Sequence, residues 1–367
     1  MEQTTKKPNA LLFGGGGAKG AFQIGAWQAL AEAGIASGMT AVAGCSVGAL
    51  NAALFAIGDP AYAKRIWEQI QPSDLLARGS DGAFFSREGL VRMINQLPLE
   101  QVSASSISTY VSVHDTAENQ PVFFKLNGLS ADAIRTLLLA SSAIPHIYAP
   151  ERYLGREFMD GSMTPEGDLC VQPIYAEGYR NMLLVSMRPQ LSLYGNSSNS
   201  GINLIENYPD CDFTLIKPTK PMGNLLTGTL NFAQNKIQAN LEQGYADAKA
   251  VLSGHGTSEL TQDEISALLV QKMRRLFLNS AQLSGFLTEY GTRFAPNVQL
   301  PTMGGNFFYD NIFEIDGWRL QQQRTPGMQI HYRILDANNI RVAWVMQPQL
   351  LLDALTDYES VLELRKH

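Results

Sequence analysis

The chain has 367 residues, of which 45% are apolar, and this length predicts one large domain or two with an ample buried core. Charged residues make up only 17%, and 28 basic against 34 acidic side chains give a net charge of −6. This composition argues against a mostly disordered chain. It also argues against nucleic acid as a partner, because phosphate backbones are bound by concentrated basic surfaces.

Cysteine usage and hydropathy predict a cytoplasmic protein. The three cysteines are too few for a disulfide framework, and none has the Cys-x-x-Cys spacing of a zinc site: Cys45, Cys170 and Cys211. The N-terminus has only four apolar residues in a row, Ala10 to Phe13, whereas a signal peptide needs a longer run and a membrane span needs ~20. Export without an N-terminal signal stays open as an alternative. We expect neither a metal nor a cofactor, because no cluster of metal-binding carboxylates is visible.

Strands and helices are predicted to alternate through the first half of the chain. Short apolar runs that end in glycine or polar residues predict buried strands at 10–13, 40–43, 110–114, 122–125, 182–187 and 213–217. Helical spacing of apolar residues predicts helices at 21–33 and 47–57. This alternation favours a doubly wound α/β sheet.

The second half is less regular. The segment Tyr194 to Gly201 is typical of an exposed loop, and helices are predicted at 231–252 and after the capping-box pattern Thr261 to Glu264. Strand-like alternation over 331–345 and a helix over 350–364 complete the chain. We therefore expect residues 256–367 to form a C-terminal mixed α/β appendage, whose role the sequence does not indicate.

The first motif is a glycine-rich segment, Gly14 to Gly20, placed between a predicted strand and a predicted helix. Its N–H groups and the helix N-terminus can converge on one anion. Gly15, Gly17 and Gly20 also fit the G-x-G-x-x-G pattern, so a dinucleotide-binding oxidoreductase is an alternative. A dinucleotide-binding site of this type has an acidic residue after the second strand, and none is present there. A P-loop does not fit, because Lys19 precedes the last glycine.

The second motif, Gly44 to Gly48 (GCSVG), lies between an apolar strand and an alanine-rich helix. This is the setting of a nucleophile elbow, in which a sharp turn presents a serine hydroxyl at a helix N-terminus. The flanking glycines, Gly44 and Gly48, remove side chains that would clash in such a turn. We therefore predict Ser46 as a nucleophile, and Cys45 as a small buried residue.

A nucleophilic serine needs a base. None of the five histidines lies in an informative motif, and His146 is the first to examine should a histidine be required. Asp160, in the sequence Met159-Asp160-Gly161-Ser162, is the better candidate, because the glycine lets a turn bring the carboxylate close to another segment.

The combination of GGGGAKG, GCSVG, ASSAIP and MDGS, in this order and spacing, resembles the patatin-like phospholipases of bacterial type. The resemblance covers residues 8–255, which we expect to form the acyl-hydrolase domain. It implies a three-layer α/β fold with a mainly parallel central sheet. Ser162 is a departure, because the family has glycine or alanine there. It is also a small residue, so we expect little change, with slightly altered support for Asp160 as the alternative.

The resemblance also implies roles for individual residues. Ser46 matches the nucleophile and Asp160 the base of a Ser–Asp dyad. The oxyanion loop corresponds to Gly15, Gly16, Gly17, Ala18 and Lys19. The oxyanion is expected to bind the N–H groups of Gly16 and Gly17, with the N–H of Gly15 or Ala18 as a candidate additional donor. Lys19 is expected to support the loop, and direct contact with a lipid phosphate is the alternative.

The implied activity is a lipid acyl hydrolase of the phospholipase A or lysophospholipase type, with a phospholipid or lysophospholipid as substrate. A transient membrane contact is expected, with Leu75-Leu76, Phe84-Phe85 and Phe307-Phe308 as candidate apolar contacts. A catalytically inactive lipid-binding module is a further alternative, and the sequence does not indicate an oligomeric state.

Overall fold

A computed structural model of the chain describes most of its length. The described residues are 9–70, 88–145, 147–189, 191, 193, 203–253, 262–276, 298–299, 309–323, 331–346 and 348–364. Several predicted features lie outside these ranges, namely His146, the apolar pairs at 75–76, 84–85 and 307–308, the loop 194–201 and the boundary between residues 255 and 256. The division into two domains at that boundary therefore stays a prediction.

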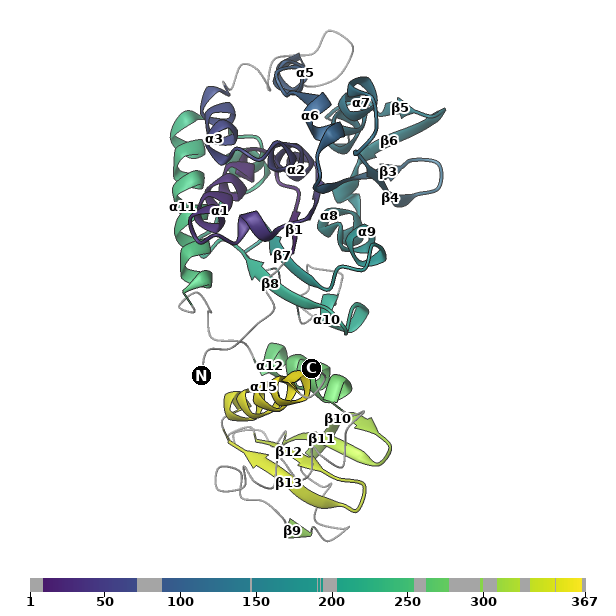
Figure 1. Ribbon diagram of the computed structural model, residues 1–367, viewed down its shortest axis with the longest axis vertical. Coiled ribbons are helices and arrows are strands. Elements are labelled where there is room, and N and C mark those ends of the chain that lie inside the picture. The colour runs from purple at the N-terminus through teal and green to yellow at the C-terminus, as the bar shows by residue number, and fades with distance from the viewer. Residues whose placement is uncertain are drawn as a thin grey trace.

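The larger part of the molecule is built on one eight-stranded sheet (Figure 1). Its strands are β1 (Ala10–Phe13), β2 (Ala41–Cys45), β3 (Ser108–Asp115), β4 (Gln120–Lys125), β5 (Glu151–Tyr153), β6 (Arg156–Asp160), β7 (Asn181–Val185) and β8 (Asp212–Ile216). The strand order is β5-β6-β3-β2-β1-β7-β8, with β4 paired to β3. The five strands from β3 to β8 along this path are parallel, whereas β4, β5 and β6 pair in antiparallel fashion.

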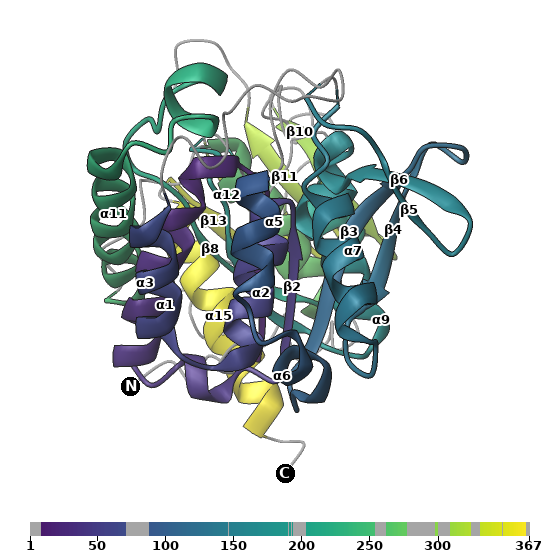
Figure 2. The ribbon, with the colours of Figure 1, turned by 90° about the horizontal axis from the view of Figure 1, so that it is seen from above.

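Helices cover both faces of this sheet, so the fold has three layers (Figure 2). One face carries α1 (Ala21–Glu32), α2 (Val47–Ile57), α3 (Pro60–Gln69), α5 (Glu88–Asn95), α6 (Leu99–Ala104), α7 (Ala131–Ser141) and α11 (Gln234–Leu252). The other face carries α8 (Pro165–Leu169), α9 (Val171–Ala176) and α10 (Leu204–Asn207). Alternate residues of β1 enter the two cores, Leu11 and Phe13 on the first face and Ala10 and Leu12 on the second. A strand buried on both faces explains the continuous apolar run that the sequence shows.

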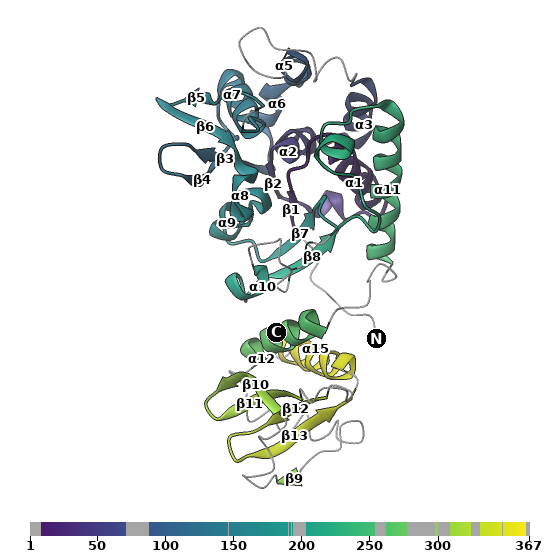
Figure 3. The ribbon, with the colours of Figure 1, turned by 180° about the vertical axis from the view of Figure 1, so that it is seen from behind.

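The C-terminal part contains a separate antiparallel sheet with the order β10-β11-β12-β13-β9. Its elements are α12 (Gln262–Leu276), β9 (Val298–Gln299), β10 (Tyr309–Ile315), β11 (Trp318–Gln323), β12 (Tyr332–Leu335), β13 (Ile340–Val345) and α15 (Pro348–Leu364). The helices α12 and α15 pack on one face of this sheet and form a core of their own with it. Figure 3 shows these helices between the two sheets, where Gln271 of α12 donates a hydrogen bond to the carbonyl of Cys211 at 3.3 Å.

The predicted fold class is confirmed, and most predicted elements appear within a few residues of their expected bounds. The helix predicted at 231–252 begins only at Gln234. The reason is local: Asn231 Oδ1 accepts a hydrogen bond from the Ala233 N–H at 3.1 Å, and such side-chain turns compete with helix formation. Every helix within the described ranges is too short or too polar to cross a bilayer.

Candidate active site

Ser46 occupies a sharp turn between β2 and α2. Its backbone has φ 55° and ψ −127°, a combination that residues with side chains rarely adopt. A Cβ at Gly44 would lie 2.1 Å from the carbonyl oxygen of Gly48, and a Cβ at Gly48 would lie 2.2 Å from that of Phe13. The turn therefore requires both glycines. It holds Ser46 at the N-terminus of α2, where the helix dipole favours negative charge.

The backbone of Ser46 is fixed by a buried serine. The Ser46 N–H donates to Ser141 Oγ at 2.8 Å, and the Ser141 hydroxyl donates to the carbonyl of Ser112 at 2.6 Å. Ser141 is the last residue of α7, so α7 and β3 together hold the strained turn in place. Sequence reasoning singled out the segment that contains Ser141 but assigned no role to this residue.

Strand register places Asp160 beside this turn. Cys45, the last residue of β2, pairs with Ser112 of β3, and Asp160, the last residue of β6, pairs with the next residue, Val113. The strand β4 pairs along one edge of β3, so β2 and β6 both pair along its other edge, where the end of one strand meets the end of the other. The Cys45 thiol accordingly donates a long hydrogen bond to Asp160 Oδ1 at 3.7 Å. The nucleophile candidate and the base candidate therefore approach each other.

The Asp160 carboxyl is 1% exposed, and its two oxygens differ. Oδ1 accepts from the Ser162 N–H at 2.9 Å, whereas Oδ2 has no hydrogen-bond partner among the residues that the structure describes. Burial raises the pKa of Asp160, and the hydroxyl of Ser46 and then the N–H and hydroxyl of Ser162 act in the opposite direction. The Ser46 hydroxyl is thus near enough to influence the carboxyl without making a hydrogen bond of standard geometry. Ser162, the departure from the family pattern, supports Asp160 through its backbone and side chain.

The glycine-rich segment lies against Ser46. A Cβ on Gly15 would be 3.3 Å from the Ser46 Cβ, and residues Gly17–Gly20 form a 3₁₀ helix, η1, that leads into α1. The N–H of Gly15 is already engaged, because it donates to Asp168 Oδ1 at 2.8 Å. The N–H groups of Gly16, Gly17 and Ala18 have no acceptor within the described ranges. These three are therefore the donors that an oxyanion could use.

A buried polar network holds both ends of the glycine segment. Gln23 Nε2 donates to the carbonyl of Gly14 at 2.7 Å, and Asn51 Nδ2 donates to that of Gly20 at 3.0 Å and to Gln23 Oε1 at 2.7 Å. The Trp67 indole N–H completes the network by donating to Asn51 Oδ1 at 2.9 Å. A satisfied buried network of this kind rigidifies its surroundings. Sequence reasoning missed it, although Gln23 and Asn51 stand out as amides within otherwise apolar helix segments.

Asp168 is the second buried carboxylate near the glycine segment, and the sequence analysis did not identify it. Its Oδ1 accepts the Gly15 N–H, and its Oδ2 lies 3.1 Å from Arg188 Nη2. Burial raises the pKa of Asp168, while Arg188 and then the Gly15 N–H lower it. Asp168 therefore anchors the glycine segment to a guanidinium that lies beyond β7. Asp168 lies in the short helix α8 and in no recognisable motif, so the sequence alone did not indicate this anchoring role.

Comparison with known proteins bears on the same region. Residues 11–167 match the family model described as "Patatin-like phospholipase". This part of the chain is a patatin-like phospholipase domain. At the level of the family, such a domain is a lipid hydrolase.

More distant structural likenesses accompany this match, and no curated protein sequence matches the chain. The crystal structure of VipD from Legionella pneumophila is 15% identical, with a TM-score of 0.44 and coverage of 78% of this chain and 76% of that chain. The type III effector protein ExoU is also 15% identical, with a TM-score of 0.38 and coverage of 81% of this chain and 67% of that chain. In the structure of full-length SpcU in complex with full-length ExoU from Pseudomonas aeruginosa, the matching chain is 17% identical. Its TM-score is 0.37, and the match covers 78% of this chain and 62% of that chain.

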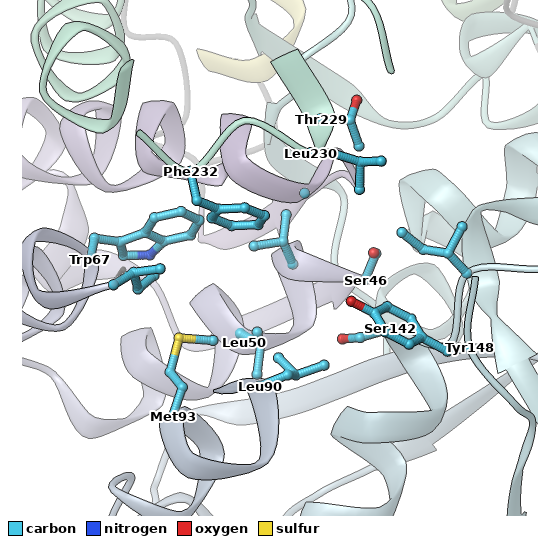
Figure 4. A pocket seen from close by; sticks show the side chains of 14 residues that line it. Ser46, Leu50, Trp67, Leu90, Met93, Ser142, Tyr148, Thr229, Leu230 and Phe232 are labelled. Atoms are coloured by element: carbon cyan, nitrogen blue, oxygen red, sulfur yellow. The ribbon is translucent and has the colours of Figure 1, made fainter. Parts of the chain in front are cut away.

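An apolar pocket opens beside Ser46 in the patatin-like domain (Figure 4). Its empty space amounts to about 510 Å³, a figure that includes the part open to solvent. Leu50, Trp67 and Phe232 contribute to its walls, and Gly17 and Ser46 also line it. The pocket thus joins the serine hydroxyl and the free N–H groups to an apolar space.

Lys19 lies on η1, at the other side of the glycine segment. A Cβ on Gly228 would be 2.6 Å from Lys19 Cε, so the lysine side chain passes over the π-helical turn Leu225–Thr229. Burial lowers the pKa of Lys19, and the nearby charge of Arg188 lowers it further. Within the described part of the chain, Lys19 forms no ion pair, although Arg188 pairs with Asp168.

Two of the histidines, His114 and His331, lie within the described part of the chain. His114 lies on β3, and its Nε2 is 3.1 Å from Asn119 Oδ1. His331 lies in the C-terminal part, directly before β12. The described residues contain no group of three or more histidine, cysteine, aspartate or glutamate side chains that could hold a metal ion.

Proposed function

We propose that this protein hydrolyses acyl esters of phospholipids or lysophospholipids, with Ser46 as the nucleophile and Asp160 as its base. The observation that carries the proposal is the strand register that sets Asp160 next to Cys45 and Ser46 along one edge of β3. The open oxygen of Asp160 and the strained turn at Ser46 fit the two roles.

The proposed reaction has two stages, acylation of Ser46 and hydrolysis of the acyl-serine. Ser46 Oγ attacks the ester carbonyl carbon, and its proton passes to Asp160. The carbonyl oxygen becomes an oxyanion, which the N–H groups of Gly16 and Gly17 bind. Collapse of the tetrahedral intermediate breaks the ester bond, and the leaving alcohol takes the proton from Asp160. A water molecule then gives a proton to Asp160 and attacks the acyl carbon. The bond between that carbon and Ser46 Oγ breaks, Asp160 returns the proton to Oγ, and the fatty acid leaves.

Burial supports the choice of an aspartate as base. An unperturbed carboxylate has a pKa of ~3.9 and is a weak base at neutral pH. Because burial raises the pKa of Asp160, this carboxylate is better matched to proton transfer under those conditions. The preorganised N–H donors at the glycine segment and the N-terminus of α2 supply further stabilisation of the developing charge.

The apolar pocket supports a lipid substrate. Ser46 lines it together with apolar side chains such as Leu50 and Phe232, and this apolar lining suits contact with an acyl chain (Figure 4). A transient membrane contact belongs to the same proposal. The dinucleotide alternative gains no support from the site, because β2 ends at Cys45 and the residue that follows it is Ser46, not a carboxylate.

The direct test replaces the nucleophile. We expect Ser46→Ala to lose at least about 10⁴-fold in kcat on a p-nitrophenyl ester, because the covalent step disappears. The variant should also escape labelling by a fluorophosphonate. Ser37→Ala removes a hydroxyl from a surface turn and serves as the matched control. The proposal would be wrong if the Ser46→Ala protein were labelled to the same extent as the wild type. It would also be wrong if the labelled peptide from the wild-type protein did not contain residue 46.

A further inference from the structure

A second hollow lies beside the glycine segment, separate from the apolar pocket. Lys19, Met187 and Arg188 line one part of it, and the segment Pro221 to Asn224 lines another. It encloses about 790 Å³, including the part open to solvent. Lys19 and Arg188 are the charged side chains of this lining, and both are basic. The chemistry of the hollow therefore suits an anion.

The hollow adjoins the site where ester cleavage is proposed. Met187 lines the hollow, and a Cβ on Gly16 would lie only 2.8 Å from Met187 Cε. On the other side of the bend, Gly17 lines the apolar pocket together with Ser46. The hollow and the pocket are thus separated by the backbone of Gly16 and Gly17, which carries the free N–H donors.

The charges in the hollow are incompletely balanced. Arg188 pairs with Asp168, but that carboxylate is buried and also accepts the Gly15 N–H. Lys19 has no acidic partner in the described part of the chain, and it feels the repulsion of Arg188. Two basic groups and one carboxylate leave the hollow with a net positive charge. An anion between Lys19 and Arg188 would remove this repulsion.

We propose that the hollow formed around Lys19 and Arg188 binds the phosphate head group of the lipid whose acyl ester lies at Ser46. The inference rests on the proposed function and specifies its substrate as an anionic phospholipid or lysophospholipid. The acyl chain occupies the apolar pocket, the ester lies at the free N–H groups, and the phosphate lies beyond the bend. Arg188 is pre-oriented by Asp168 and offers its remaining donors, and Lys19 supplies a mobile point charge.

The arrangement links head-group binding to the reacting ester. Asp168 contacts both Arg188 and the Gly15 N–H, so the group that binds the phosphate and the start of the glycine segment share one anchor. A phosphate held at Arg188 therefore fixes the substrate relative to the oxyanion donors. Neutral lipids with the same acyl chain lack this contact and should be poorer substrates.

The experiment compares two lipids that share a lauroyl chain, lauroyl-lysophosphatidylglycerol and monolauroylglycerol, below their critical micelle concentrations. The readout is the ratio of kcat/KM for the anionic lipid to that for the neutral lipid. In Lys19→Gln we expect this ratio to fall by about tenfold, because one charged contact to the phosphate is lost. Lys220→Gln is the matched control, since Lys220 is an exposed lysine directly before the Pro221 wall and does not line the hollow. Its ratio should stay at the wild-type value.

Inorganic phosphate separates a head-group site from a site for the free ion. We expect millimolar phosphate to compete with lauroyl-lysophosphatidylglycerol and to leave hydrolysis of monolauroylglycerol unchanged. Equal inhibition of both lipids would mean that the hollow is a regulatory anion site and would overturn the proposal. An unchanged ratio in Lys19→Gln, or an equal fall in Lys220→Gln, would overturn it as well.

Binding measurements keep this test independent of catalysis. Calorimetric titration of the Ser46→Ala protein with each lipid gives a ratio of dissociation constants, which we expect Lys19→Gln to shift by about tenfold in the same background. If neither lipid is hydrolysed by the wild-type protein but this ratio shifts, the proposed function fails while the phosphate site stands. If both lipids are hydrolysed and neither ratio responds to Lys19→Gln, only the phosphate site fails.

Discussion

The surroundings of Asp160 and of Asp168 show two ways to bury a carboxylate near the same glycine segment. Both are 2% exposed or less, and burial raises the pKa of each. Asp168 has both oxygens engaged, one by the Gly15 N–H and one by Arg188. Asp160 has one oxygen engaged by Ser162 and one without a partner in the described structure.

The difference separates a positioning role from a chemical one. A carboxylate whose lone pairs are satisfied by fixed donors holds those donors in place and has little capacity to accept a further proton. A buried carboxylate with an unsatisfied oxygen is costly to the fold, and such groups persist where they take part in function. The comparison predicts that substitutions at the two positions affect catalysis to different extents and by different routes.

The largest effect is expected from Asp160→Asn. The amide keeps the shape of the side chain but cannot take the serine proton, so kcat on a p-nitrophenyl ester should fall by about 10³-fold or more. Circular dichroism should show an unchanged fold. A loss of less than about tenfold would indicate that another group acts as the base, and His146 would then be the first candidate.

A smaller effect is expected at Asp168. Asp168→Ala removes the acceptor of the Gly15 N–H and the partner of Arg188, so the glycine segment loses its anchor and kcat should fall by about 10²-fold. Asp168→Asn retains an oxygen that can accept the Gly15 N–H, and it should recover most of the rate. Equal losses in both variants would contradict the anchoring role, because the carboxylate charge alone would then matter.

The smallest effect concerns stability. Burial raises the pKa of Asp160, so this group favours folding most at a pH below its ordinary pKa, and the contribution is lost as the pH rises through the raised value. At pH 8, Asp160→Asn should therefore melt about 2–4 °C higher than the wild type. The difference should shrink as the pH is lowered and the wild-type carboxyl becomes protonated. Glu100→Gln removes an exposed carboxylate and should show no comparable gain.

Local sequence patterns predicted the parts of the site that depend on a single segment. The GCSVG motif indicated the turn at Ser46, because a strand, two glycines and a helix suffice to define it. The helix predicted at 47–57 has those bounds in the structure. The three-layer fold followed from the resemblance, and the catalytic roles of Ser46 and Asp160 stay predictions.

Contacts between distant segments could not be predicted in this way. Asp168 meets the Gly15 N–H across 153 positions, and Ser141 meets Ser46 across 95. Neither partner belongs to a recognisable motif, since one lies in a five-residue helix and the other is a serine at the end of an amphipathic helix. Hydrogen bonds of this kind depend on how strands order themselves in the sheet, and a single sequence does not specify that order.

The pairing of β6 with β3 has a consequence for how this protein tolerates insertions and deletions. Side chains alternate between the two faces of a sheet, so adding or removing one residue in β6 would turn the carboxyl of Asp160 through the sheet while leaving its identity intact. Strand length is therefore constrained here as strictly as amino-acid type. A library that varies the length of the β5–β6 turn, at Leu154 and Gly155, should be far more permissive than one that changes the length of β6 itself.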